Sequence, residues 1–398
     1  MTQPTHRDVA DRCPGVFSTH AAADGAVARV RLPGGRIQPG QLEILAQAAA
    51  AHGDGFLEPT ARGNLQLRGI SDVAAVAQAV IDAGLAPSKT HDTVRNIEVS
   101  PLTGRIGGAA DVWPVADALD AGLRADDRST ALSGRFLLGV DDGRGDIVRR
   151  RPDACALARR EAPDAAKDAV GATGIVADIM VDGELLGSAT GVDGIVAALL
   201  DVAHDFTAVA PQAWRVGDLT AEQRDSLVSG VRARLAPAIG GATSTDATDA
   251  ADPIVGWFDQ DDGAVLLGAV VELGRLPARL AEFLAAVGKP LIFTPDREIL
   301  LCDLDEGVAE TVVRVLAPMG LIFDASSPWA RVSCCVGAPG CSKAAAPVRD
   351  DLLERVRAGE SVEDREHWVG CGRRCGSPAG PHLLVEATPD DGYRTHRR

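Results

Sequence analysis

The sequence predicts an α+β fold that contains two related halves, and three observations lead to this prediction. Hydrophobic residues make up 46% of the 398 residues, which is enough for a sizeable core and excludes a disordered chain. Similar stretches begin at Asp24 and at Asp262. Between them, residues 241–252 are polar and of low complexity, which is typical of a linker. At about 150 residues per domain, this length corresponds to two or three domains.

The two similar stretches share one order of expected elements. Each begins with an Asp-Gly turn and continues with a β-rich run, a Gly-Arg turn, an apolar helix and a strand around an arginine. The helices are expected at 41–51 and 278–287 and the strands at 55–67 and 291–301, with Arg62 aligned to Arg297. A repeated β-α-β unit of this kind is typical of a ferredoxin-like fold, with chance similarity of two Ala-rich stretches as the alternative.

The remaining segments mix both element types. Residues 73–83 and 193–204 are expected to be helical, whereas 96–99, 135–140 and 175–181 are expected to be strands, the last leading through Asp182-Gly183 into a hairpin. After the second repeat, helices are expected at 308–316 and 346–358, and strands at 332–335 and 383–386. This mixed order favours α+β over a regular alternation of strands and helices.

Charge and composition exclude several function classes. The 40 basic residues against 56 acidic residues give a net charge of −16, which disfavours nucleic acid and anionic membranes as partners. Aromatic residues make up only 4%, which also disfavours base stacking. The first residues lack an apolar signal segment, and no apolar run approaches the roughly 20 residues of a spanning helix. We therefore expect a cytoplasmic protein.

Five of the eight cysteines lie between residues 334 and 375, and four of them form the pattern C-x5-C-x29-C-x3-C. The four are Cys335, Cys341, Cys371 and Cys375. Four thiolates on two Gly-rich loops can ligate a [4Fe–4S] cluster. A zinc site, whose cysteine pairs are usually separated by two to four residues, and inert buried thiols are the alternatives. Cys334 competes with Cys335 for one ligand position, and Cys13, Cys155 and Cys302 are expected in the core.

Arginines and amides form a second group of candidates. Arg62, Asn64, Gln66 and Arg68 alternate with other residues, so on a strand they would share one face. Arg95, Asn96 and Arg135 follow along the chain. Because a guanidinium group binds carboxylates with two hydrogen bonds, these residues are candidate ligands of an anionic molecule. A solvated strand face is the alternative interpretation.

With these residues in view, the chain resembles the nitrite/sulfite reductase superfamily and, within it, the precorrin-3B synthases of aerobic cobalamin biosynthesis. The resemblance covers nearly the whole chain: the repeated halves, Thr-x-Arg-x-Asn-x-Gln-Leu at 60–67, Val94-Arg95-Asn96 and the cysteine pattern. Residues 132–146 and 367–371 are similar to the synthase branch. Sulfite reductases have Lys-Phe-Lys where this chain has Arg135-Phe136-Leu137, and here only 63 residues follow Cys335, which separates it from the reductases.

The resemblance implies an architecture and an activity. The architecture is sulfite reductase-like, with duplicated ferredoxin-like halves (1–72 and 253–325), a first catalytic lobe (73–240), the linker and a short second catalytic lobe (326–398) that carries the cluster. The activity is that of a monooxygenase, which uses O2 to hydroxylate precorrin-3A at C20 with formation of a γ-lactone. Electrons would come from NAD(P)H through a reductase or ferredoxin partner, because the chain has no dinucleotide-binding Gly motif of its own.

The resemblance also assigns roles to residues. Cys335, Cys341, Cys371 and Cys375 would hold the cluster, and Cys375 matches the cysteine that bridges cluster and haem iron in sirohaem enzymes. Arg62, Arg95 and Arg135 would be catalytic and, with Asn64, Gln66, Arg68 and Asn96, would bind the substrate. The resemblance also implies a second redox centre, which would be either sirohaem or a mononuclear iron. The spacing of the eight histidines does not indicate which residues would bind a mononuclear iron. The alternatives are an assimilatory sulfite or nitrite reductase with sirohaem, and a zinc-stabilised binding module.

Overall fold

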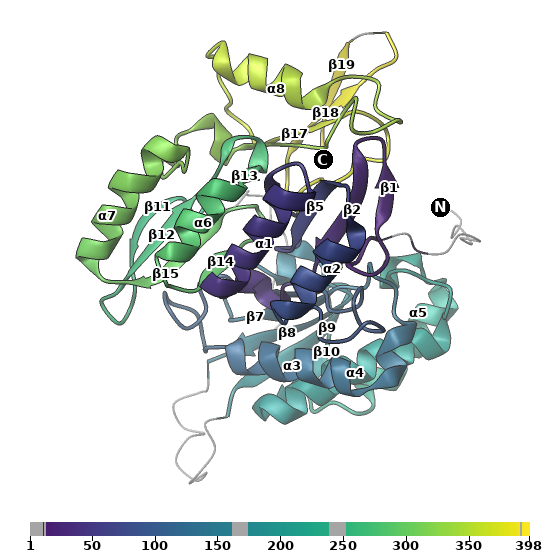
Figure 1. Cartoon of the computed structure of the whole chain (residues 1–398). Coiled ribbons are helices and arrows are strands. Elements are labelled where there is room, and N and C mark those ends of the chain that lie inside the picture. Colours follow the sequence, from purple (N-terminus) through teal and green to yellow (C-terminus); the bar gives the residue numbers. More distant parts are fainter. Residues whose placement is uncertain (1–10, 12, 161–173, 239–251, 391) are drawn as a thin grey trace. The chain divides into compact units, whose positions relative to one another are not determined.

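The computed structural model describes residues 11, 13–160, 174–238, 252–390 and 392–398 (Figure 1). The chain divides into two compact units, which we call the lobe unit (residues 1–13 and 88–247) and the repeat unit (residues 14–87 and 248–398). Both units combine helices with β-sheets, which confirms the predicted α+β class. Among the helices of the described residues, none is both long and apolar enough to pass through a membrane.

The repeat unit contains two halves with the same order of elements, which confirms the predicted duplication. The first half consists of β1 (His20–Ala22), β2 (Gly25–Val30), β3 (Arg36–Ile37), α1 (Pro39–His52), β4 (Phe56–Pro59), β5 (Leu65–Ile70) and α2 (Val73–Asp82). The second half consists of β11 (Gly256–Asp259), β12 (Val265–Ala269), β13 (Leu276–Pro277), α6 (Ala278–Ala286), β14 (Leu291–Phe293), β15 (Ile299–Leu304) and α7 (Glu306–Leu316).

Each half lends one short strand to the sheet of the other. The two sheets have the orders β1-β2-β5-β4-β13 and β11-β12-β15-β14-β3. Leu276 of β13 pairs with Leu57 of β4, and Ile37 of β3 pairs with Leu291 of β14. The apolar faces of both sheets and of α1 and α6 share one buried cluster, so the two halves have a common core.

The strands predicted at 55–67 and 291–301 are each two strands joined by a tight turn, which corrects the prediction. In the first turn the N–H of Thr60 donates to the carbonyl of Asn64 at 2.8 Å, and in the second Thr294 donates to Glu298 at 2.9 Å. Gly63 (φ 67°) and Arg297 (φ 69°) occupy the same left-handed position. Arg297 therefore corresponds to Gly63, one residue away from the predicted alignment with Arg62.

The boundary predicted at residue 72 is also wrong for one helix. The segment 73–83 is helical as expected, but α2 buries Val76 and Val80 in the core of the repeat unit. It therefore completes the first half and does not begin the lobe. Residues 241–251 of the predicted linker lie outside the described residues.

The lobe unit is built on one sheet with the order β10-β9-β8-β7-β6. Its elements are β6 (Ile97–Val99), α3 (Trp113–Ala125), β7 (Leu138–Asp141), β8 (Ala154–Arg159), β9 (Val176–Val181), β10 (Glu184–Thr190), α4 (Gly191–Val209) and α5 (Ala221–Arg232). Strands β6, β7 and β8 are parallel, whereas β9 and β10 are antiparallel and form the predicted hairpin at Asp182-Gly183.

A smaller sheet completes the repeat unit. It has the order β16-β17-β18-β19 and contains β16 (Val332–Cys334), β17 (Glu366–Val369), β18 (Leu383–Ala387) and β19 (Tyr393–Arg397), with helix α8 (Val348–Arg357) against it. Short 3-10 helices lie at Pro33–Gly35, Asp127–Ala131, Val148–Arg150, Val216–Asp218, Glu272–Gly274, Ala317–Met319 and Pro328–Ala330. Because β16 and β17 are parallel neighbours, their carboxyl ends lie at the same edge of the sheet.

Candidate functional site

The two cysteine loops begin at this common edge. Cys335 directly follows the last residue of β16. Cys371 is separated from Val369, the last residue of β17, by one residue. The N–H of Cys335 donates to the carbonyl of Trp368 at 2.9 Å. The N–H of Ala345 donates to the carbonyl of Gly370 at 2.8 Å, so each loop is bonded to the other. The topology therefore explains why cysteines separated by 29 residues come together.

The four predicted thiols lie within electrostatic reach of one another. Burial raises the pKa of the Cys375 thiol, and the neighbouring Cys335, Cys371 and Cys341 raise it further. Burial likewise raises the pKa of Cys335, to which Cys371 and Cys341 also contribute. The structure thus brings all four together, with Cys375 as the exposed member of the group.

Backbone amides are directed at one of these sulfurs. Cys335 Sγ accepts a hydrogen bond from the N–H of Gly370 at 3.2 Å, and the N–H of Gly337 also donates to it. A Cβ on Gly370 would lie 2.5 Å from the Ala344 Cβ, and a Cβ on Gly337 would lie 2.6 Å from the Val348 nitrogen. These positions require glycine because the loops approach so closely. Amide donors to a thiolate stabilise its charge and tune a bound metal group.

Cys334 has a different environment from Cys335. Burial raises the pKa of the Cys334 thiol to about 12, and its charged neighbours include Arg349, Arg297 and Glu58. It therefore lies against the interior of the repeat unit, where a thiol stays protonated. Among the two competing residues, the structure places Cys335 with Cys341, Cys371 and Cys375.

A zinc ion and an iron–sulfur cluster require different spacings of their cysteine sulfurs. A tetrahedral zinc ion with Zn–S bonds of about 2.3 Å holds its sulfurs about 3.8 Å apart. Among the residues that the structure describes, no three cysteines have their sulfurs within 4.8 Å of one another. A [4Fe–4S] cluster binds each cysteine to a different iron and needs a wider set of thiols.

The residues at 62–68 do not form one strand face, which corrects that prediction. Arg62 and Asn64 lie in the turn between β4 and β5, and only Gln66 and Arg68 lie in β5. The turn forms because the Thr60 hydroxyl accepts hydrogen bonds from the N–H groups of Arg62 (3.4 Å) and Asn64 (3.2 Å).

The side chains of Asn64, Gln66 and Arg68 have partners within the first half of the repeat unit. Asn64 Oδ1 accepts from the N–H of Leu32 at 2.8 Å, and the Gln66 amide donates to Glu58 at 3.2 Å. Arg68 is buried and forms a two-pronged ion pair with Asp24 at 2.9–3.0 Å. Their polar atoms thus stabilise the first half of the repeat unit, whichever molecule binds nearby.

The remaining candidates belong to the lobe unit. Arg95 is only 7% exposed and binds Asp120 of α3 with two hydrogen bonds of 2.6 and 3.1 Å. The Asn96 amide donates to two backbone carbonyls at 2.9 Å. Arg135 lies over the Trp214 ring at 4.4 Å and pairs with Asp11 at 3.2 Å, while its side chain stays 47% exposed. Since Arg62 lies in the other unit, the convergence of Arg62, Arg95 and Arg135 stays a prediction.

Two residues beside the cysteine loops were not predicted as site residues. Burial lowers the pKa of His367 to about 3, so the ring is neutral. Its Nε2–H donates to the carbonyl of Cys375 at 3.1 Å, and its Nδ1 accepts from the Ser333 hydroxyl at 2.8 Å. Arg297, from the turn between β14 and β15, donates to the carbonyl of Gly376. In the sequence, only one signal could have indicated that these residues belong to the site, namely the position of His367 four residues before Cys371.

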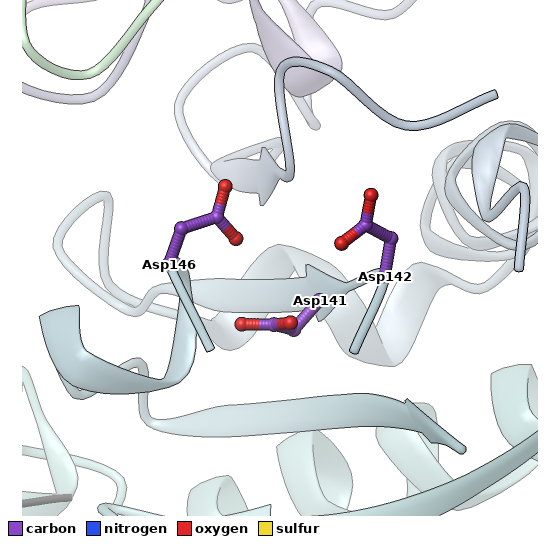
Figure 2. A group of neighbouring side chains, drawn as sticks. All are labelled: Asp141, Asp142 and Asp146. Carbon is purple, nitrogen blue, oxygen red and sulfur yellow. The ribbon is translucent and has the colours of Figure 1, made fainter. Parts of the chain in front are cut away.

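A group of three carboxyl groups lies at the end of β7 in the lobe unit (Figure 2). Oxygens of Asp141, Asp142 and Asp146 lie within 4.8 Å of one another. Asp141 accepts from four backbone N–H groups, Asp142 is bound by Arg144 and Asp146 accepts from Ser100 at 2.5 Å. Burial raises the pKa of Asp146 to about 7. The loop's own donors account for these contacts.

Comparison with known proteins agrees with the fold of the repeat unit. Residues 20–82 match the nitrite/sulfite reductase ferredoxin-like half domain, a match that ends at the last residue of α2. Along 96% of its length the chain is similar to a precorrin-3B synthase from Sinorhizobium sp, with 25% identity over 399 residues and coverage of 81% of that protein. The resemblance inferred from the sequence motifs is therefore confirmed.

More local similarities connect the chain to nitrite reductases. A ferredoxin–nitrite reductase from Leptolyngbya laminosa is 38% identical over 104 residues, and one from Synechococcus elongatus is 30% identical over 145 residues. These matches cover only 20% and 28% of those proteins. The solved structure of the Mycobacterium tuberculosis NirA protein superposes with a TM-score of 0.66 at 16% identity, covering 94% of this chain and 73% of that one. This likeness confirms the predicted sulfite reductase-like architecture.

Proposed function

From this relationship to the nitrite/sulfite reductase superfamily, we propose that the chain is an oxidoreductase of the precorrin-3B synthase type. It would hydroxylate precorrin-3A at C20 with O2 and form a γ-lactone, as a monooxygenase of cobalamin biosynthesis. The similarity along 96% of this chain and 81% of the Sinorhizobium protein carries the proposal. By contrast, the similarity to nitrite reductases is restricted to a minor part of their length.

In this proposal Cys335, Cys341, Cys371 and Cys375 hold a [4Fe–4S] cluster. When bound, the cluster supplies single electrons to the reaction. The chain contributes the thiolates and the amides of Gly337 and Gly370, whose hydrogen bonds to Cys335 stabilise negative charge on its sulfur. The exposed position of Cys375 supports its family role as the cysteine nearest a second centre, either sirohaem or a mononuclear iron.

The substrate carries several carboxylates, and the arginines differ in their capacity to bind them. Arg135 is about half-exposed while it stacks on Trp214 and pairs with Asp11, so it is the more exposed of the two candidate arginines in the lobe unit. Arg62 lies half-buried in the β4–β5 turn. Arg95 is already bound by Asp120, so its role would be to shape the lobe rather than to contact a carboxylate directly. Electrons would arrive from NAD(P)H through a reductase or ferredoxin partner.

Aerobic turnover of precorrin-3A by anaerobically purified protein tests the proposal. With a chemical or enzymatic reductant, we expect an O2-dependent hydroxylactone in which one new oxygen derives from labelled O2. Cys371→Ser should abolish product because it removes a cluster ligand, whereas Cys302→Ser, in the fully buried core of β15, should retain it. Absence of the labelled product from an iron- and sulfide-replete protein would contradict the assignment.

A sirohaem-dependent sulfite or nitrite reductase is the second candidate, supported by the local similarity to two nitrite reductases and by the shared fold. Sirohaem absorbance in the purified protein, together with reduction of sulfite or nitrite, would establish it. One zinc per chain with neither iron nor acid-labile sulfide would instead support the zinc-stabilised module.

A further inference from the structure

We propose that Arg68 and Arg297 are positioning residues that hold the two cysteine loops and favour electron uptake by the cluster. The inference rests on the proposed cluster ligation. One arginine comes from each half of the repeat unit, and each donates to a backbone carbonyl next to a ligand cysteine. Arg68 of β5 donates to the carbonyl of Gly340, which precedes Cys341, at 3.4 Å. Arg297 donates to the carbonyl of Gly376, which follows Cys375.

The second loop is held at two successive carbonyls. His367 binds the carbonyl of Cys375 and Arg297 binds that of Gly376. Arg297 reaches this place because it occupies the left-handed position of the β14–β15 turn, where the other half has Gly63. The duplication thus supplied the turn, and the arginine at this position gives the second copy a function that the first copy lacks.

The loop that contains Gly340 and Cys341 is held by an ion pair, whereas the loop of Cys375 is held by His367 and the single arginine Arg297. Arg68 is bound by Asp24, and the Asp24 carboxylate lies 2.9 Å from where a Cβ of Gly340 would be. The Gly340 segment is therefore packed directly on the Arg68–Asp24 pair. Because Arg68 is buried and is the partner of the Asp24 carboxylate, loss of the arginine would leave an unpaired negative charge beside the loop of Cys341.

Positive charge near an iron–sulfur cluster stabilises its reduced form, since reduction adds negative charge. The guanidinium group of Arg297 lies directly against the loop of Cys375: besides its bond to the carbonyl of Gly376, its Nη2 lies 3.0 Å from where a Cβ of Gly376 would be. Arg297 therefore combines two effects, fixing the Cys375 loop and raising the midpoint potential. Arg68 fixes the Cys341 loop, while its charge is balanced by Asp24.

Redox titration of the cluster, followed by electron paramagnetic resonance, tests the proposal on the full chain. For Arg297→Met we expect a roughly tenfold weaker preference for the reduced cluster, which corresponds to about 59 mV toward more negative potential for one electron. Arg297→Lys keeps the charge and should restore the potential. Arg331→Met is the matched control, because Arg331 also donates to a backbone carbonyl, that of Glu363 at 2.9 Å, but outside the cysteine loops.

Two variants test the first loop. Arg68→Met leaves the Asp24 charge unpaired and should shift the potential negatively, whereas Arg68→Met combined with Asp24→Asn removes both charges and should return it toward the parent value. An Arg297→Met protein with full iron content and the parent potential would overturn the proposal, as would an equal shift in Arg331→Met.

A measurement without the cluster separates this inference from the proposed function. In apoprotein, Arg297→Met should increase the alkylation rate of Cys375 several-fold relative to that of Cys13, while Arg331→Met should not. If the parent protein binds no cluster but this difference appears, the proposed function fails and the loop-holding role stands. If the alkylation rates are equal and the potentials unchanged, the positioning role is refuted while the cluster assignment remains.

Discussion

Single side chains decide whether the two cysteine loops can form a site. Cys335 receives two amide hydrogen bonds, and its neighbour Cys334 is turned into a buried environment that keeps its thiol protonated. Two adjacent cysteines of identical chemistry thereby have different surroundings. The distinction depends on which sulfur the amides of Gly370 and Gly337 reach, and two consecutive cysteines in the sequence do not reveal this.

Substitution of one ligand tests the thiol assignment directly. Cys341→Ser or Cys371→Ser should remove nearly all the cluster absorbance, because a hydroxyl is a poor substitute for a thiolate on iron. Cys334→Ser should leave most of it. Iron and acid-labile sulfide content of anaerobically prepared proteins gives the measurement, and loss of the cluster in Cys334→Ser with retention in Cys341→Ser would reverse the assignment.

Asp146 is expected to make stability depend on pH. Burial and the nearby Asp141 raise its pKa in the folded protein to about 7, above the ordinary value of 3.8. A raised carboxyl pKa contributes stability that is complete below about pH 4 and is lost as pH rises through 7. The free energy of unfolding should therefore fall by about 1–3 kcal/mol between pH 5 and pH 8.

Urea unfolding of Asp146→Asn at both pH values checks this expectation. The variant keeps an oxygen that can accept from Ser100, so it should fold while losing most of the pH dependence. The charges of Asp141 and Asp142 raise the pKa of Asp146 further, whereas the charge of Arg144 lowers it. An unchanged slope would show that Asp146 is not the group responsible.

At the scale of elements, buried ion pairs connect helices to sheets. Arg95 lies just before β6, and Asp120 lies on α3, so their pair fastens this helix to the edge of the lobe sheet. Both side chains are largely buried. Arg95→Ala should therefore lower the free energy of unfolding by about 3–5 kcal/mol, since it leaves the Asp120 carboxylate buried with Arg124 as its other cation.

Denaturant unfolding and tetrapyrrole binding, measured on the same variant, separate structure from recognition. Arg135→Ala provides the contrast, because its guanidinium group is half-exposed and should cost less than 1 kcal/mol of stability. A marginal loss of stability in Arg95→Ala, accompanied by a large loss of affinity, would return Arg95 to the substrate-binding set.

Periodicity predicted most elements because helices and strands leave regular apolar patterns. The helices at 73–83 and 308–316 and the hairpin at Asp182-Gly183 were identified in this way, and the structure confirms them. The β4–β5 turn was missed because the polar alternation continues through it, and only Gly63 marks the reversal. The cysteine group was predictable from spacing. The Arg297 contact was not, since a bond to a backbone carbonyl leaves no side-chain pattern.

At the scale of the whole repeat unit, the two halves contact each other closely at a glycine of the first half. Gly35, next to the exchanged strand β3, has φ 73°, and a Cβ there would lie 2.0 Å from the carbonyl oxygen of Phe293 in β14. The close approach joins the first half directly to the sheet of the second. Because the core is shared, damage at this point should affect both halves at once.

Gly35→Ala is expected to destabilise the repeat unit by about 2 kcal/mol or more through strain and overlap. Trp257, half-exposed on β11, reports on the second half by its fluorescence. Its unfolding midpoint in urea should fall in the variant, although the substitution lies in the first half. Gly40→Ala, at a helical glycine with open space around it, is the matched control and should leave the midpoint nearly unchanged. An unaltered Trp257 midpoint in Gly35→Ala would mean that the halves unfold independently.

The exchange of β3 and β13 also has a consequence for ancestry. Each half completes its sheet only with a strand from the other, so a single ancestral copy would have exposed an unpaired sheet edge. Two identical copies could have satisfied that need by trading strands across a twofold axis, as symmetric dimers do. Joining two such copies in one gene would free each copy from the symmetry, so that the two turns could carry different residues, as Gly63 and Arg297 do here.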